Sequence, residues 1–333
     1  MPRSSSAVNN KRSLATESEM PARQKRAKKI TIERLLKVIK NGQVEQLQEI
    51  IKDEAIFFAE LTACQWNLIF NAAADNCRID ELEALLHIQS TYTRSLTAPI
   101  VYSRVLRSAC IPSDLELMKL ALQRGALVDS AGEDDGLSCL HIAAELRNLE
   151  AMQLLLNNGA DINKCTSPNN KRLPNYTALR RSCVLGYREV IGFLLEHGAA
   201  ICVGGRNALV DAAHNKPILE TIVKEYGINI DITDEYGQTA LWQACFNVDY
   251  GLIALLECGA NPNISARTHN TPTLEPLLPS ICNKDTPSYV VQFLLSHAAA
   301  VDAVDSQGEP PYFMHVRAHI ITQSNFCSST VPM

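Results

Sequence analysis

The chain has 333 residues, of which 46% are hydrophobic and 20% charged, a balance typical of folded proteins rather than disordered ones. No apolar run is long enough to cross a bilayer and the N-terminus is polar and basic, so we expect neither a membrane span nor a secretory signal. The net charge is −5 overall but +6 over residues 1–30, which leaves −11 on the remainder and makes nucleic-acid binding by the folded part an unfavourable interpretation.

Eleven cysteines are scattered singly along the chain, and none forms a Cys-x-x-Cys pair. We expect reduced thiols in the core rather than disulfides or a zinc site. This usage, with the absence of a secretory signal, predicts an intracellular protein that is nuclear, cytoplasmic or both.

Residues 1–29 are rich in Ser, Ala and charge and have no apolar period, which predicts a disordered basic tail. Two basic clusters lie in it, separated by a gap of twelve residues. Their spacing resembles a bipartite nuclear import signal, which would engage an import receptor; the alternative is a solvated basic tail. The residues concerned are Lys11, Arg12, Lys25, Arg26, Lys28 and Lys29.

Residues 30–97 show a weaker helical pattern. From Ile30 to Ile51 apolar residues fall on two helix faces that are broken at Asn41-Gly42, as expected of an N-terminal cap on a helical array. A second divergent unit runs from Phe70 to Leu86, and a clearer one from about Ser103 to Asp129.

The most regular stretch runs from Glu133 to Asn163. It holds a short helical pattern rich in small residues, a second pattern with Leu at buried-stripe spacing, and Gly159 at the closing turn. Neither helix can bury its apolar face alone, so the unit needs a neighbour on each side. Its opening GLSCLHIAA and its close LLNNGADIN resemble the corresponding parts of an ankyrin repeat.

The same pattern recurs after residue 163. Further units span 176–201, 207–231 and 236–263, and a degraded one with Pro276 and Pro279 ends at Asp302. Closing glycines at 125, 159, 198, 227 and 259 are separated by 34, 39, 29 and 32 residues, close to the ankyrin period of about 33. The predicted fold class is an all-α, ankyrin-type α-solenoid of about seven to eight helix pairs with short β-hairpin turns.

The predicted organisation has four parts. The disordered tail covers 1–29, divergent ankyrin-like repeats and a cap cover 30–97, and the main array covers 98–305. Residues 306–333 would form a partial repeat or a C-terminal cap with a disordered tail, because GEPPY at 308–312 opens a unit whose second helix does not follow.

Catalytic motifs are missing from the sequence. It contains no GxSxG, no HExxH, no P-loop and no strand-led GxGxxG, so we predict that it is not an enzyme and needs no cofactor. His315 and His319 are four residues apart but have no acidic or cysteine partner nearby, so we expect no metal site there.

The ankyrin resemblance assigns roles to several single positions. It implies that His141 links neighbouring repeats through hydrogen bonds. Arg180 and Arg181 depart from the family pattern, and either a partner segment or acidic residues of the previous repeat, such as Glu145, could pair with them. Trp242 stands at the position of the same His in a later repeat. We favour the interpretation that its ring fills the gap between repeats over the alternative that it contacts a partner.

The resemblance also implies that side chains directly after the two small residues of each first helix line a concave groove. Several of these are apolar in the middle of the array, which predicts a partner-binding patch. The alternative is that distorted repeats bury them against their neighbours. The candidate binding residues are Ile111, Leu146, Val184, Leu185 and Phe246, with Arg181 at the edge.

The predicted function is therefore that of a scaffold or adaptor that holds a protein partner in the groove, with a nuclear regulatory role indicated by the basic tail. The alternative is a substrate-recognition subunit of a ubiquitin ligase, although no recognisable C-terminal box follows Asp302. Two further rivals are an enzyme that has lost its catalytic domain and direct nucleic-acid binding by the tail.

Overall fold

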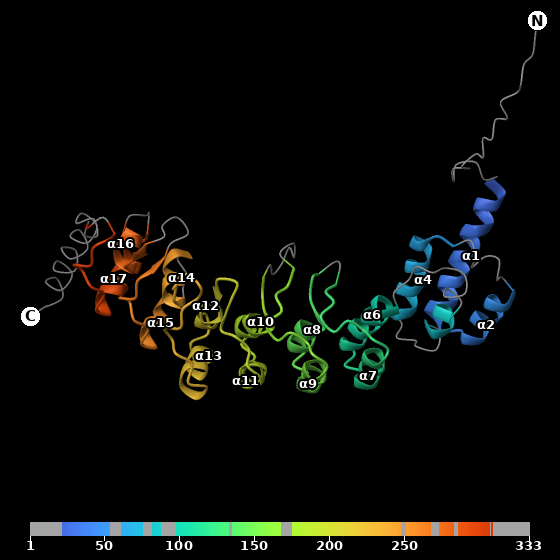
Figure 1. The fold of residues 1–333 in the computed structure, drawn as a ribbon, viewed down its shortest axis with the longest axis horizontal. Coiled ribbons are helices and arrows are strands. Elements are labelled where there is room, and N and C mark those ends of the chain that lie inside the picture. The colour runs from blue at the N-terminus through green and yellow to red at the C-terminus, as the bar shows by residue number, and fades with distance from the viewer. Residues whose placement is uncertain are drawn as a thin grey trace, which may run out of the picture. The chain divides into compact units, whose positions relative to one another are not determined.

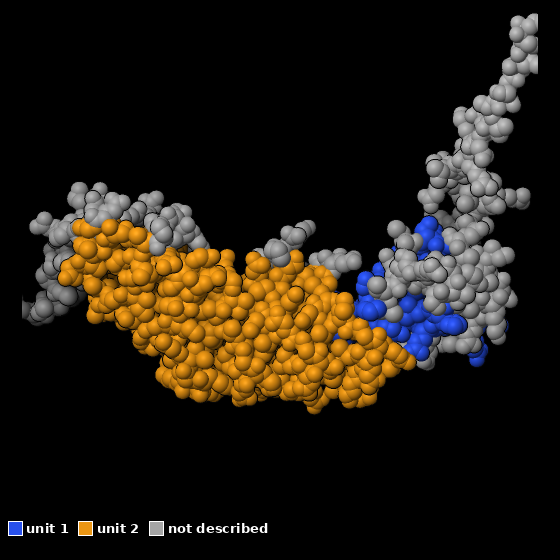
Figure 2. All heavy atoms as spheres, viewed as in Figure 1, with its two compact units in different colours: residues 1–108 blue, residues 109–333 orange. Residues whose placement is uncertain are grey.

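A computed structural model describes residues 22–53, 61–75, 82–87, 98–132, 135–167, 175–247, 251–267, 273–282, 286–306 and 308. The chain divides into two compact units, residues Met1–Ser108 and Ala109–Met333, which Figure 2 draws in blue and orange. The division falls inside the helix that begins at residue 98, where the sequence places the start of the main array. Each unit is described by itself below.

Unit 1 contains α1 (Ala22–Asn41), α2 (Val44–Asp53), α4 (Ala63–Asp75) and most of α6 (Ala98–Cys110), and residues 82–87 are also helical. α1 packs against α2 and α4. Leu35, Ile39 and Leu47 are fully buried, and the stacked rings of Trp66 and Phe70 lie 5.5 Å apart. The predicted break at Asn41-Gly42 is the turn between α1 and α2, and Gly42 supplies the positive φ of 67°.

The start of α1 corrects the predicted boundary of the basic tail. α1 begins at Ala22, so the second basic cluster, at residues 25–29, lies within its first turns rather than in an unstructured segment. Ala, Arg, Lys and Gln all have high helix propensity, and they directly precede an amphipathic stretch that nucleates the helix. Lys11 and Arg12 lie outside the described residues.

Unit 2 is a stack of antiparallel helix pairs, which confirms the predicted solenoid. Figure 1 shows the first helices of the pairs in one row and the second helices in another. Neighbouring first helices contact one another along the row. After α7 (Leu115–Gln123) the described pairs are α8 (Cys139–Glu145) with α9 (Leu149–Asn157), α10 (Ala178–Leu185) with α11 (Arg188–Glu196), α12 (Ala208–Ala213) with α13 (Lys216–Glu220), α14 (Ala240–Asn247) with α15 (Leu252–Glu257), and α16 (Leu277–Cys282) with α17 (Ser288–Ser296).

Local sequence determines where these helices begin and end. The side chains of Asp114, Asn148 and Thr177 each accept a hydrogen bond from a backbone N–H in the first turn of the helix that follows. Four of the predicted closing glycines, at 125, 159, 198 and 259, adopt φ values between 85° and 93°. Ala298 stands at the same place in the last described pair with φ 64°, a conformation that is strained for a residue with a Cβ atom.

The second helix that ends before Gly227 holds one residue more than its counterpart in the preceding pair. Ile218 and Leu219 stand 28 residues after their buried counterparts Val190 and Ile191, whereas Gly227 stands 29 residues after Gly198. One extra residue must therefore fit into the second helix. It is accommodated by a π-helical turn, η2 (Thr221–Glu225), that continues α13.

Short hairpins join some of the pairs. β1 (Cys202–Val203) and β2 (Arg206–Asn207) pair in an antiparallel register, Cys202 opposite Asn207. Gly204 and Gly205 form the two-residue turn with φ values of 56° and 67°, as a tight hairpin requires. β3 (Ala266–Arg267) pairs with β4 (Leu274–Glu275) in the same way.

Side-chain amides and carboxylates link the closing loops of successive pairs. The Asn163 side-chain oxygen accepts a hydrogen bond from the N–H of Ala200 at 2.8 Å, and Asn263 accepts one from Ala300 at 2.7 Å. Asp231 does the same for the N–H of Asn261 at 2.9 Å. These bonds satisfy backbone N–H groups in the loops that follow the second helices.

Candidate partner-binding surface

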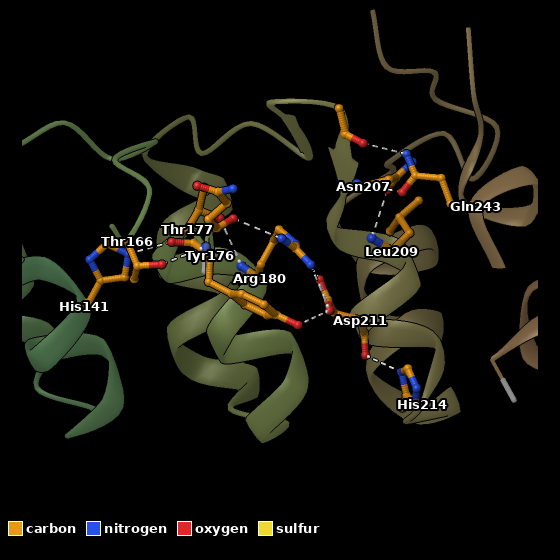
Figure 3. Close-up of polar contacts among 12 residues, drawn as sticks. His141, Thr166, Tyr176, Thr177, Arg180, Asn207, Leu209, Asp211, His214 and Gln243 are labelled. Atoms are coloured by element: carbon orange, nitrogen blue, oxygen red, sulfur yellow. Dashed lines mark hydrogen bonds and ion pairs between the residues drawn. The ribbon is translucent and has the colours of Figure 1, made fainter. Parts of the chain in front are cut away.

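His141 links its repeat to the next, as the sequence predicts. Its Nε2 lies 3.0 Å from the carbonyl oxygen of Tyr176 (Figure 3). Its Nδ1 lies 2.8 Å from Oγ of Ser138. Because a carbonyl oxygen only accepts, Nε2 carries the proton and Nδ1 accepts from the Ser138 hydroxyl. The imidazole is buried and has both nitrogens satisfied, which is a structural role.

Arg180 occupies, in the following repeat, the position equivalent to His141. Its longer side chain contacts the repeat after that. Its Nε donates to Oδ2 of Asp211 at 2.6 Å and its Nη2 donates to Oδ1 of the same carboxylate at 3.2 Å. Figure 3 shows the two side chains pointing toward one another. They are 8% and 9% exposed. Asp211 belongs to α12, in the repeat that follows, so Arg180 pairs in the opposite direction from the previous-repeat carboxylates that the sequence suggested.

Tyr176 completes this buried cluster. Its hydroxyl donates to Oδ1 of Asp211 at 3.3 Å, and the Arg180 guanidinium carbon lies 4.0 Å from the centre of its ring. Burial raises the pKa of Asp211 above its ordinary value, although the charge and hydrogen bonds of Arg180 oppose the shift. Burial and the Asp211 carboxylate likewise raise the pKa of Tyr176, so its hydroxyl stays a donor.

Arg181 points to the previous repeat. Its Nε donates to Oε1 of Glu145 at 2.7 Å, with the two side chains 24% and 30% exposed. This is one of the two arrangements the sequence left open. The pair therefore occupies the edge of the predicted patch, with its charges balanced.

The apolar candidates differ in exposure. Ile111 is 66% exposed, and Leu146 and Val184 are each 46% exposed. Leu185 and Phe246 are half-buried, and the Phe246 ring stacks on Trp242 with the ring centres 5.3 Å apart. Trp242 is itself 2% exposed, so it fills the core between repeats as the favoured interpretation predicts.

Leu146 and Val184 occupy corresponding ends of neighbouring helices. Leu146 is the C-cap of α8 and Val184 lies in the last turn of α10, and these two helices pack together. Past them, after α12, the equivalent residues His214 and Asn215 are polar and exposed. The apolar section is thus centred on α8 and α10, and we call Leu146, Val184 and Leu185 the inner patch.

The predicted import signal and the histidine pair at 315 and 319 cannot be compared with described side chains. The side chains at residues 25–29 and the residues Lys11, Arg12, His315 and His319 lie outside what is described. In the described ranges, no cluster of three His, Cys, Asp or Glu side chains is arranged to hold a metal ion. None of the helices within these ranges is long and apolar enough to cross a membrane.

Sequence reasoning missed Arg147, which follows the inner patch residue Leu146. It adopts φ 56°, and its guanidinium carbon lies 5.2 Å from the centre of the Tyr187 ring in the next repeat. The signal was available, because the next repeat has Gly186 at the equivalent place.

One family model and two solved structures are similar to parts of this chain. A family model described as "Ankyrin repeats (3 copies)" matches residues 70–166 and 105–204. The human ASB11 ankyrin repeat domain is similar with a TM-score of 0.43 and 22% identity, covering 68% of this chain and 99% of that one. The ankyrin repeat domain of Bcl-3, described as a unique member of the IkappaB protein family, is similar with a TM-score of 0.45 and 20% identity, covering 68% and 97%.

Proposed function

Because this chain is an ankyrin-repeat protein, and ankyrin repeats are non-enzymatic modules for protein–protein interaction, we propose that it is a scaffold or adaptor that holds a partner protein against the inner patch. The binding residues we assign are Leu146, Val184 and Leu185, with Ile111, Phe246 and Arg181 at the margins. Shape and apolar contact would provide the affinity, and the charges at the edge would provide selectivity.

The observation that carries the proposal is the paired exposure of Leu146 and Val184. Both are large apolar side chains with 46% of their surface exposed, at the ends of the adjacent first helices α8 and α10. The other apolar residues of these two helices are buried, except the half-buried Leu185. Burying the exposed half of each would contribute roughly 1 kcal/mol. Together with Ile111 and the accessible part of Leu185 they supply a small anchor, which neighbouring polar contacts would extend.

A direct test compares the partners recovered by three forms of the full chain. The wild-type protein, a Val184→Glu, Leu185→Glu double variant and a Val301→Glu control are each used as bait in cell extract, after circular dichroism has confirmed their folding. Val301 is 49% exposed but lies in the loop after α17, away from the inner helices, so it matches the chemistry without touching the patch.

We expect the double variant to lose a defined set of partners that the wild-type and Val301→Glu proteins retain. Recovery of the same set by all three would exclude the inner patch as the binding surface. If the lost set contains ubiquitin-ligase core subunits together with a substrate, the function is that of the alternative, a substrate-recognition subunit.

We also propose that the protein enters the nucleus through its two basic clusters. The test fuses the chain to a carrier too large to diffuse through the nuclear pore, and compares wild type with a variant in which Lys11, Arg12, Lys25, Arg26, Lys28 and Lys29 are alanine. Lys37→Ala with Lys40→Ala is the control, since both lysines are exposed on the later turns of α1. Equal distribution of all three fusions would contradict nuclear import by this route.

A further inference from the structure

We propose that Arg147 adds a carboxylate-binding position beside the inner patch, so that the preferred occupant is a segment of a partner protein in which apolar residues adjoin Asp or Glu. This inference rests on the proposed function, because it names the chemistry of the segment that the same surface binds. It is carried by the backbone, the ring contact and the charge balance around Arg147.

The backbone at Arg147 has the conformation that suits glycine. The same turn occurs in three successive repeats: the N–H groups of Ser113, Arg147 and Gly186 bond to the carbonyl oxygens of Cys110, Ala144 and Cys183 at 3.2, 3.1 and 3.2 Å. The φ values are 56° for Arg147 and 72° for Gly186. A side chain at this φ costs free energy that glycine avoids, and such costs concentrate at functional positions.

The side chain of Arg147 is held over an aromatic ring. The guanidinium carbon lies 5.2 Å from the ring centre of Tyr187, which is the N-cap residue of α11. Arg147 is exposed, and Tyr187 is half-buried. A guanidinium that lies over a ring keeps N–H donors open at its edge, and that edge matches the two oxygens of a carboxylate.

Three cations of the following repeats are paired, whereas Arg147 forms no ion pair among the described residues. Arg181 bonds Glu145, Arg188 bonds both oxygens of Glu225 at 2.5 Å, and Lys216 bonds Glu257 at 2.7 Å. In the part of the chain that the structure describes, the Arg147 guanidinium contacts the Tyr187 ring and no carboxylate.

The nearest carboxylates in sequence do not alter this. Glu150 and Glu189 lie in the first turns of α9 and α11, where they favour the positive helix ends, and neither pairs with Arg147 among the described contacts.

Position joins this charge to the apolar surface. Arg147 directly follows Leu146, and Tyr187 comes two residues after Leu185, so the ring contact and the inner patch bridge the same two repeats. A segment that places an apolar side chain on Leu146 and Val184 has its adjoining residues next to the guanidinium. A carboxylate there would form a charge-assisted, two-point hydrogen bond that an amide cannot reproduce.

The test selects a phage-displayed library of random peptides on the full chain and then measures Kd for selected peptides synthesised with Asp or Glu and with the matching Asn or Gln. We expect the selected peptides to combine apolar residues with Asp or Glu, and the amide versions to bind about tenfold more weakly. Arg147→Gly should cause a loss of similar size for the acidic peptides and none for the amide ones. Glycine suits the φ of 56° at this position, so we expect folding to be retained, and circular dichroism checks it.

Lys224→Gln is the matched control, since it removes one exposed positive charge from the second row of helices. It should leave Kd unchanged. Selected peptides without acidic residues, or acidic peptides that bind wild type and Arg147→Gly equally, would overturn the inference while leaving the proposed function intact. Peptides that also bind the Val184→Glu, Leu185→Glu variant with unchanged Kd would overturn both.

Discussion

The Arg180 guanidinium and the Asp211 carboxylate form a buried, two-point ion pair that joins α10 of one repeat to α12 of the next. The equivalent position one repeat earlier holds His141. Its imidazole N–H forms a single hydrogen bond with a backbone carbonyl. Breaking a buried pair leaves an uncompensated charge, whereas removing both partners can be tolerated. This junction therefore responds differently to single and to double substitution.

Arg180→Leu alone should lower the free energy of unfolding by about 3 kcal/mol or more, because Asp211 is then left buried without its cation. Arg180→Leu combined with Asp211→Leu should recover much of that loss. Urea titration followed by circular dichroism measures both, with a broadened transition expected if the array unfolds in parts. Equal losses for the single and double variants would contradict the expected cost of leaving Asp211 buried without its cation.

Glu275 should make stability depend on acid pH. Its carboxylate accepts hydrogen bonds from the hydroxyl and the N–H of Ser306 and from Thr273, and the Ser306 hydroxyl is the main cause of its lowered pKa. Because the folded pKa lies below the unfolded value of about 4.3, the carboxylate stabilises the fold above that pH and loses this effect as pH falls through the folded pKa.

The measurement for Glu275 is thermal unfolding of wild type and Glu275→Gln from pH 7 down to pH 3. Wild type should be the more stable at pH 7, and the difference should shrink as the solution becomes acidic. A difference that stays constant across the range would indicate a packing effect instead.

Gly251→Ala should destabilise unit 2 by about 1–3 kcal/mol, as overpacking does. A Cβ atom at Gly251, the N-cap of α15, would lie 2.6 Å from Cβ of Ala213 on α12, with backbone atoms just behind it. Gly192→Ala is the comparison, since its Cβ meets the hydroxyl end of Tyr226, which can rotate away. Urea midpoints should fall further for Gly251→Ala, and the reverse order would contradict the rigid α12–α15 contact.

Ala298→Gly should stabilise the last described repeat, by about 0.5–1 kcal/mol. Ala298 has φ 64° at the place where other repeats carry glycine, so the substitution removes strain that exceeds the added chain entropy. Ala299→Gly is the control. Ala299 is 6% exposed, so losing its methyl group should destabilise. Differential scanning calorimetry compares the two, and a lower melting temperature for Ala298→Gly would exclude strain as the governing term.

Several features of the fold could be predicted because they depend on residues close together in sequence. Small residues at Ala143 and Ala144, leucines at helical spacing and glycine at the closing turns define a helix pair without reference to the rest of the chain. The role of His141 followed from the same repeat pattern. The burial of Trp242 was favoured because an indole ring fills more space than the imidazole it replaces.

The sequence by itself thus determined the repeating helix pairs, their stacking and the positions that face away from the core, because period and turn chemistry are local. Tertiary structure alone decided which charges meet. Arg180 pairs forward with Asp211, 31 residues on, whereas its neighbour Arg181 pairs backward with Glu145. Adjacent residues on a helix point about 100° apart, so the rotation of each helix against its neighbours selects the partner. The packing of the helices against one another also leaves Leu146 and Val184 exposed and buries Trp242, whose ring stacks on Phe246. It places Arg147 over the ring of Tyr187.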